Sequence, residues 1–161
     1  SASETVPNQT PPPQQDLRSL SFQQALPHIS RLMEDPRVVE DLVKMKQEQV
    51  RLEKQLWEER EVISKSHEEK VKVAMNKTKL IGASLSKHDA ELMSDAFRME
   101  LRKFDAERVL PTWDRLVRDQ QMRLEALRIP TMFITNDAGD TEKQRLVMQV
   151  VEGILPTSGA T

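Results

Sequence analysis

The amino-acid sequence predicts an all-α protein built around a long antiparallel helical hairpin that resembles a coiled coil. The chain of 161 residues has 4% aromatic residues and only 4 glycines, and it is rich in Leu, Glu, Lys, Arg, Gln and Met, which favour helix. Two long stretches repeat apolar residues at alternating spacings of three and four. A short glycine-containing break separates them, and such short connections are typical of antiparallel neighbours.

The N-terminal part is predicted to hold a tail and a short helix. Residues 1–20 carry Pro7 and a Pro11-Pro12-Pro13 run among polar residues. Such a composition buries too little apolar surface to offset the entropy of ordering, so we expect a disordered tail. Ser21 and Gln24 have the spacing of a capping box. A short helix over residues 21–34 follows, although Pro27 interrupts its apolar stripe.

The first arm of the hairpin is predicted to begin at Asp35-Pro36, because Asp caps free amides and Pro lacks an N–H at the first helical position. No further Pro or Gly occurs before Gly82, where we expect a turn near residues 82–86. Between them runs an a/d heptad pattern that indicates packing against a second long helix. The positions of this seam are Val38, Leu42, Met45, Gln49, Leu52, Leu56, Glu59 and Ile63.

The second arm is predicted to run from a cap at Ser86 to Ile129, so that the hairpin spans residues 35–129. Pro111 lies inside this arm, and we expect a kink rather than two separate helices because Leu110 is a poor cap. Folding the chain near residue 84 aligns apolar residues along most of the seam. The predicted neighbours are Leu42 with Leu127, Met45 with Leu124, Leu52 with Leu116 and Val117, Leu56 with Trp113, and Val73 with Phe97.

Residues 130–155 are predicted to form an extended segment followed by an amphipathic helix. The helix is expected to start at Thr141, with Gln144 completing a capping box. We expect the stretch from Ile129 to Leu155 to be the specific element of the protein, either packed on the hairpin as a third helix or inserted into a partner. Residues 156–161 are expected to be a flexible tail.

The sequence nominates no catalytic, cofactor-binding or metal-binding residues. The absence of Cys removes disulfides, thiolate nucleophiles and Cys-based zinc sites. His67-Glu68 begins the helical zinc motif H-E-x-x-H, but Val71 stands where the second His is required. Acidic pairs such as Glu58-Glu59 lie on a helix predicted to be solvated, where no carboxylate is held neutral. We therefore expect a protein that is not an enzyme and that needs no cofactor.

The hairpin tip, residues 65–87, is predicted to be basic, because six lysines there face only two glutamates. Its central lysines are Lys70, Lys72, Lys77 and Lys79. Clustered lysines bind phosphate backbones or acidic protein surfaces. The tip has no Arg and no aromatic residues for base stacking, which favours an acidic protein over nucleic acid.

Apolar residues outside the seam predict a surface for other proteins, because large exposed apolar patches are rare on monomers. These residues are Val39, Val43, Val50, Trp57, Val62 and Val71. We therefore expect a helical scaffold or adaptor subunit of an intracellular complex, in the cytoplasm or nucleus. Its partners would be helical proteins or a second copy of the chain. The candidate contact residues are Trp57, Trp113, Met132, Phe133, Val147, Val150, Val151 and Ile154.

Two alternatives remain open at this point. The protein could be a nucleic-acid-associated accessory protein that uses the lysines of the tip, or a helical protein that tethers membranes. No apolar run is long enough to span a bilayer, and no signal-peptide pattern opens the sequence.

Overall fold

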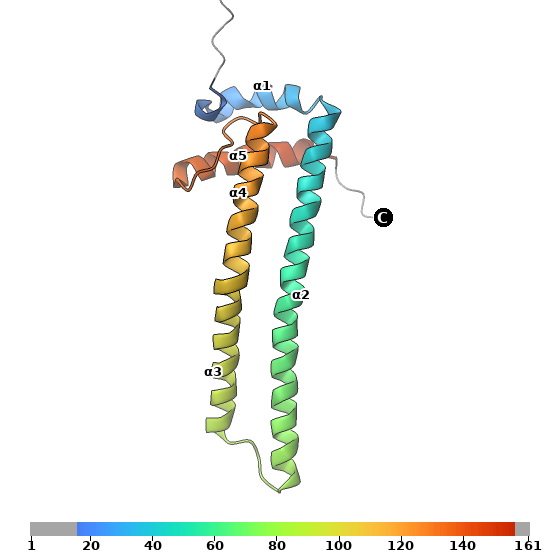
Figure 1. The fold of residues 1–161 in the computed structure, drawn as a ribbon, viewed down its shortest axis with the longest axis vertical. Helices are drawn as coiled ribbons and strands as arrows, with labels where there is room; N and C mark the ends of the chain where they lie inside the picture. The colour runs from blue at the N-terminus through green and yellow to red at the C-terminus, as the bar shows by residue number, and fades with distance from the viewer. Residues whose placement is uncertain (1–15, 157–161) are drawn as a thin grey trace, which may run out of the picture.

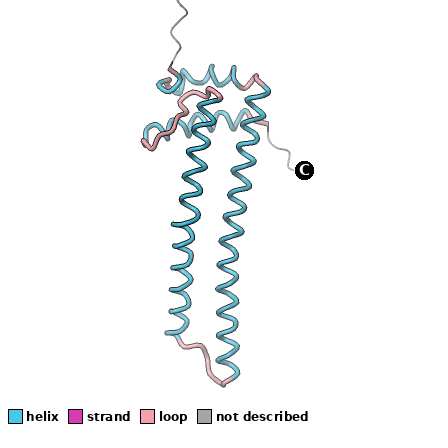
Figure 2. Tube along the Cα trace, in the orientation of Figure 1, coloured by secondary structure: helices cyan, strands magenta, loops and turns pink. Residues whose placement is uncertain are grey.

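The computed structural model describes residues 16–156, and the secondary structure of this part is entirely helical (Figures 1 and 2). A long helix, α2 (Pro36–Leu80), lies beside a return arm made of α3 (Lys87–Phe104), η2 (Asp105–Val109) and α4 (Leu110–Ala126). Two shorter helices, α1 (Phe22–Leu32) and α5 (Ala138–Ile154), cross one end of this pair. The predicted all-α hairpin with a short N-terminal helix and a C-terminal helix is confirmed.

The helix ends of α1 and α2 follow from local chemistry. The capping box of α1 is present, because Gln24 N–H donates to Ser21 Oγ and Ser21 N–H donates to Gln24 Oε1. At the start of α2, Arg37 N–H donates to Asp35 Oδ1 at 2.9 Å, and Pro36 occupies the first turn. At 1.5 Å per residue, the 45 residues of α2 span about 68 Å.

Gly82 ends α2 in a left-handed conformation, with φ of +75°. Its N–H donates to Lys79 O at 3.1 Å, and the N–H of Ala83 donates to Thr78 O at 2.9 Å. These two bonds form a Schellman motif, which satisfies carbonyls at the end of the helix and reverses the chain. The predicted turn near 82–86 is therefore in place.

The chain is ordered earlier than the sequence predicted. Residues 1–15 of the predicted disordered tail, and 157–161 of the C-terminal tail, lie outside the described residues. Within the remainder, Leu17–Ser19 form a 3₁₀ turn, η1, and Leu20 is buried. The prediction of disorder to residue 20 is wrong there because a distant loop holds this segment: Thr131 N–H donates to Leu17 O at 2.8 Å, and Arg18 pairs with Glu125.

Pro111 distorts the return arm without breaking it. Pro lacks an N–H, and its ring clashes with the carbonyl four residues earlier. The chain responds with a π-helical segment, η2, in which Leu110 N–H donates to the carbonyl of Asp105, five residues back. The backbone stays in the right-handed helical region at both ends of η2. One continuous path, rather than two separate helices, is confirmed.

The predicted register holds near α1 and α5 and drifts toward the tip. Leu42, Met45, Leu124 and Leu127 belong to one core, as expected. Farther along, the ring of Phe97 stacks on His67 with centroids 4.2 Å apart, six residues before its predicted neighbour Val73. A π segment takes up about one more residue than an α-helical turn, so η2 accounts for part of this displacement.

The buried core lies almost entirely at the end that carries α1 and α5, which we call the head: η1, α1, the start of α2, the end of α4, the loop 127–137 and α5. Of the apolar side chains that are buried in the described part of the chain, only Leu56 lies outside the head. The fully buried side chains of the head include Ile29, Ile129, Val147 and Val151. Each such side chain contributes about 1.5–3 kcal/mol to stability. The rest of the hairpin, the arm, has little core of its own.

Leu56 and Trp113 provide a test of the register in the arm. Leu56 is buried and Trp113 is half-buried. We predict that Leu56→Ala lowers the free energy of unfolding by about 2–5 kcal/mol and Trp113→Ala by less. If the two side chains are neighbours, urea denaturation of the single and double variants should show a coupling of at least about 0.5 kcal/mol. The pair Leu56→Ala and Leu92→Ala is the control, because Leu92 is exposed, and strict additivity in both pairs would contradict the register.

Candidate protein-interaction surface

Two buried glutamines fix the loop between α4 and α5. Gln121 Nε2 donates to Gln144 Oε1 at 3.0 Å and to Thr135 O at 3.3 Å. Gln144 Nε2 donates to Thr131 O at 3.1 Å and to Phe133 O at 3.0 Å. Carbonyls of a loop pressed against a core need such donors, because an unpaired buried polar group is costly. The two amides therefore determine how the loop and α5 sit on the hairpin.

The predicted start of the last helix was three residues too late. Helix α5 begins at Ala138, because the carboxylate of Asp137 accepts from Asp140 N–H at 3.0 Å and acts as the cap. Gln144 is thus not part of a capping box at Thr141. It lies in the second turn and points inward, where it is buried.

The same loop holds two residues in the left-handed backbone region, Arg128 with φ of 65° and Thr131 with φ of 68°. This conformation is a genuine outlier for the β-branched Thr131, whose buried hydroxyl also has no partner among the described residues. Thr131 is nevertheless held from both sides, since its N–H donates to Leu17 and its carbonyl accepts from Gln144. The loop is therefore fixed by its surroundings and not by its own preference.

Several predicted contact residues belong to the core of the head. Met132, Val147 and Val151 are buried, and Val150 packs against them. These four side chains therefore hold α5 and the loop on the hairpin, which is the first of the two arrangements that the sequence left open. They are corrected from candidate contact residues to structural ones.

The other predicted contact residues stay accessible. Phe133 is half-buried, with the guanidinium carbon of Arg18 5.1 Å from its ring centroid, a cation–π arrangement. Ile154 is half-exposed at the end of α5, and Trp113 is half-buried on α4. Trp57 is 63% exposed on α2.

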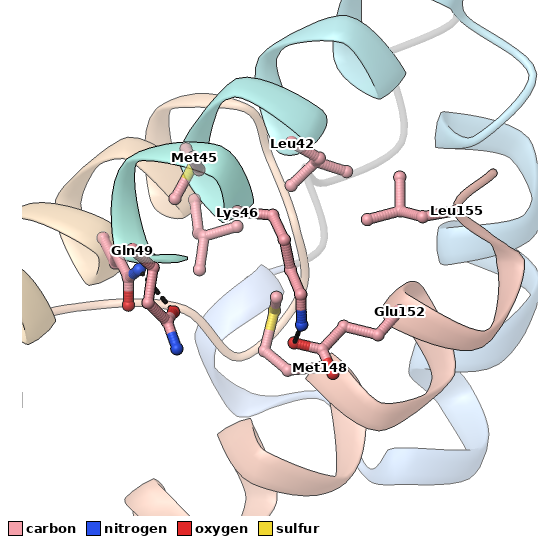
Figure 3. A pocket seen from close by; sticks show the side chains of 9 residues that line it. Leu42, Met45, Lys46, Gln49, Met148, Glu152 and Leu155 are labelled. Atoms are coloured by element: carbon pink, nitrogen blue, oxygen red, sulfur yellow. Dashed lines mark hydrogen bonds and ion pairs between the residues drawn. The ribbon is translucent and has the colours of Figure 1, made fainter. Parts of the chain in front are cut away.

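A groove of about 210 Å³ lies where α2, α4 and α5 meet (Figure 3). Its apolar lining comes from Leu42, Met45, Leu124, Met148 and Leu155. Two polar pairs border it: Lys46 Nζ lies 3.4 Å from Glu152 Oε1, and Gln120 Nε2 donates to Gln49 Oε1 at 3.0 Å. Small-molecule pockets usually measure 300–1,000 Å³. This groove is the size of one or two apolar side chains of another protein.

An uncharged row on α2 continues from the groove. Lys46 borders the groove, and Val50 and Trp57 follow it by four and eleven residues, so they lie on the same side of the helix. Val50 is 52% exposed. Twenty of the 45 residues of α2 are charged, yet one heptad position carries no charge along the whole helix. This outer row consists of Val43, Val50, Trp57, Ser64, Val71 and Thr78. Val50 and Trp57 are its exposed members, and the other four are half-buried.

The sequence contained the signal for the outer row, but the row was not recognised. Val43, Val50, Trp57 and Val71 were singled out only as uncovered apolar residues. Their seven-residue spacing relates them to one another and adds Ser64 and Thr78. The groove at the head end of the row could not be found this way, because α4 and α5 supply most of its lining.

The geometry of the described residues gives little support to the other possibilities that the sequence raised, such as a metal site. Within residues 16–156, no three His, Asp or Glu side chains are grouped so that they could hold a metal ion. His67 stacks on Phe97. On the outer face of α5, hydrogen bonds from Arg145 to both carboxylate oxygens of Glu142 (2.6 and 2.9 Å) lower the pKa of Glu142. This pair stabilises the surface of the helix and does not indicate a binding site. None of the described helices is long and apolar enough to cross a membrane.

Comparisons with known proteins yield one match. Residues 18–149 match the family described as "Protein of unknown function (DUF2458)". No curated protein and no solved structure matches the chain. The matched residues run from η1 into α5 and so include the whole hairpin and most of the head.

Gln144 provides a test of the amide pair. Gln144→Leu leaves the amide of Gln121 and the carbonyls of Thr131 and Phe133 without their partners. We predict a loss of about 2–3 kcal/mol in the free energy of unfolding and faster hydrogen exchange across the loop. Gln149→Leu, on the exposed side of α5, is the control and should change stability by no more than about 0.5 kcal/mol. Equal small effects from both would show that the amide pair does not fix the loop.

Proposed function

The chain belongs to the DUF2458 family, and we propose that it is a non-enzymatic helical scaffold or adaptor subunit of an intracellular multiprotein complex. The observation that carries this proposal is the continuity between the groove and the outer row of α2. The groove and the exposed side chains of Val50 and Trp57 form one accessible apolar track that begins at the head and follows the first part of the arm.

The chemistry of the track suits a helix of another protein. Side chains that repeat every seven residues along one side of a helix match the repeat of a second helix packed alongside it. Trp is among the residues that contribute most to binding energy at interfaces, and Trp57 is the largest side chain of the row. A Leu or Met side chain at the end of the partner helix would fill the groove.

The division between head and arm also supports a scaffold. The head supplies nearly all of the buried core, whereas the arm extends α2 far beyond it with only Leu56 fully covered. A pair of helices can cover one seam and leaves its outer sides accessible. An arm of this kind stabilises its own fold little, which favours a role in contacts with other subunits. The partner can be another protein or a second copy of this chain.

Removing α5 would not test the proposal cleanly. Deletion from Thr131 onward would remove nearly all of the stretch that the sequence predicts to be the specific element. That deletion also removes Met132, Val147 and Val151 from the head core, so a loss of binding could reflect loss of the fold. Substitutions at Val50 and Trp57, the exposed members of the outer row, avoid this ambiguity.

We predict that a Val50→Glu/Trp57→Glu variant loses its protein partners in a pull-down from extract, with recovery reduced at least about tenfold. Met99→Glu is the matched control, because Met99 is 68% exposed on α3 and lies off the row. Circular dichroism should show both variants folded. Sedimentation velocity with the purified chain separates a second copy from a different protein. Unchanged recovery with the double variant would exclude the outer row as the binding surface.

A further inference from the structure

The end of the hairpin farthest from the head exposes two adjacent aliphatic side chains. Leu80 is 86% exposed and Ile81 is 79% exposed, the highest values among the large apolar residues of the described chain. They stand at the last turn of α2, where the chain reverses (Figure 1). Nothing in the described fold covers them, and the two-helix packing of the arm does not need them.

Hydrogen bonds fix the backbone at this end of α2. The Schellman motif at Gly82 and Ala83 closes the helix immediately after Ile81. The hydroxyl of Thr78 also donates to the carbonyl of Met75 at 2.9 Å. From Leu80 to Ser86 the chain has no charged residue. The apex is thus a defined, uncharged, convex surface.

Lysines surround this apex without matching carboxylates. From Lys70 through Lys87 there are five lysines and neither Asp nor Glu, although the whole chain has a net charge of −2. Across the turn, the first turns of α3 contribute Asp89 and Glu91, and Lys87 lies 3.9 Å from Glu91. Within the described part of the chain, no ion pair involves the other four lysines of this stretch, Lys70, Lys72, Lys77 and Lys79.

We propose that the hairpin tip docks on an anionic phospholipid surface, with Leu80 and Ile81 entering the boundary between headgroups and acyl chains and the lysines contacting lipid phosphates. A bilayer accepts both features at once, since a polybasic segment is attracted to anionic lipids and apolar side chains gain burial. Either signal alone gives weak, reversible binding, and the two together bind more tightly than either alone.

The alternatives fit only half of this surface. A nucleic-acid backbone would use the lysines, but it would leave two aliphatic side chains at the contact, and the tip has no aromatic residue for stacking. A protein partner would need a concave apolar pocket ringed by acids to receive a convex apex. The proposal is independent of the outer row, which lies along the arm, and it would place the head at the far end of a helix about 68 Å long.

The experiment is flotation of the full chain with vesicles of phosphatidylcholine alone or mixed with phosphatidylserine. We expect binding to the mixed vesicles and little to phosphatidylcholine. Leu80→Ser/Ile81→Ser should weaken binding to the mixed vesicles at least about tenfold. Lys77→Gln/Lys79→Gln should weaken it roughly tenfold or more and reduce its salt dependence.

Matched controls lie on the arm. Val62→Ser/Met99→Ser alters side chains that are 66% and 68% exposed, and Lys44→Gln/Lys54→Gln removes two exposed lysines of α2. Both should bind vesicles like the native chain. The Val50→Glu/Trp57→Glu variant should do so too, so the vesicle experiment tests the tip separately from the scaffold proposal. Circular dichroism confirms that each variant is folded.

Three results would overturn the proposal. The first is no binding of the folded native chain to the mixed vesicles. The second is binding that Leu80→Ser/Ile81→Ser leaves unchanged. The third is binding to a double-stranded DNA oligonucleotide that requires Lys77 and Lys79 but not Leu80 and Ile81, with no vesicle binding, which would assign the tip to nucleic acid.

Discussion

The rest of the head depends on one constraint: the loop after α4 must turn back across the hairpin with its carbonyls paired. Gln121 and Gln144 meet this constraint from two different helices. They fix Thr131 in a conformation that it would not adopt alone, and this places Met132 in the core and brings α5 against α1. The order of residues 16–20 follows from the same loop, since Thr131 holds Leu17.

The number of packed elements explains why the head has a closed apolar core and the arm does not. Four helices and a loop can enclose Ile29, Ile129 and Val147 completely, whereas two helices side by side enclose only a line of side chains. Beyond the head, polar and aromatic pairs cross the seam, among them Arg108 with Glu59 and His67 with Phe97. Half-exposed ion pairs of this kind are worth at most about 1 kcal/mol. The arm is therefore held by a single line of buried and half-buried apolar side chains, among them Leu56, Leu101 and Leu116, which leaves its outer faces available.

Local signals made the hairpin predictable from the sequence, whereas the features that depend on long-range contacts were not predictable in this way. The caps at Ser21, Asp35 and Ser86 and the stop at Gly82 act within a few residues, so the sequence alone located them. The start of α5 was predicted at Thr141, but Asp137 caps the helix at Ala138 and Gln144 is buried under it. Part of the drift of the register comes from η2, where Pro111 signals a distortion but not how many residues it takes up. For the candidate site, the outer row was present in the spacing, but the groove required α5 to be placed.

The distribution of charge relates the two ends of the molecule. Five lysines are concentrated near the tip while the whole chain is net negative, so the remainder of the chain must be more negative than the total. Most of this negative charge lies along the arm, and the head is close to neutral. An anionic surface therefore attracts the tip and not the sides of the arm, within the screening distance of about 8 Å at physiological salt. Such a molecule would meet an anionic surface end-on, with the tip first. The outer row then points sideways from the standing arm, where a helical partner can reach it without competing for the surface.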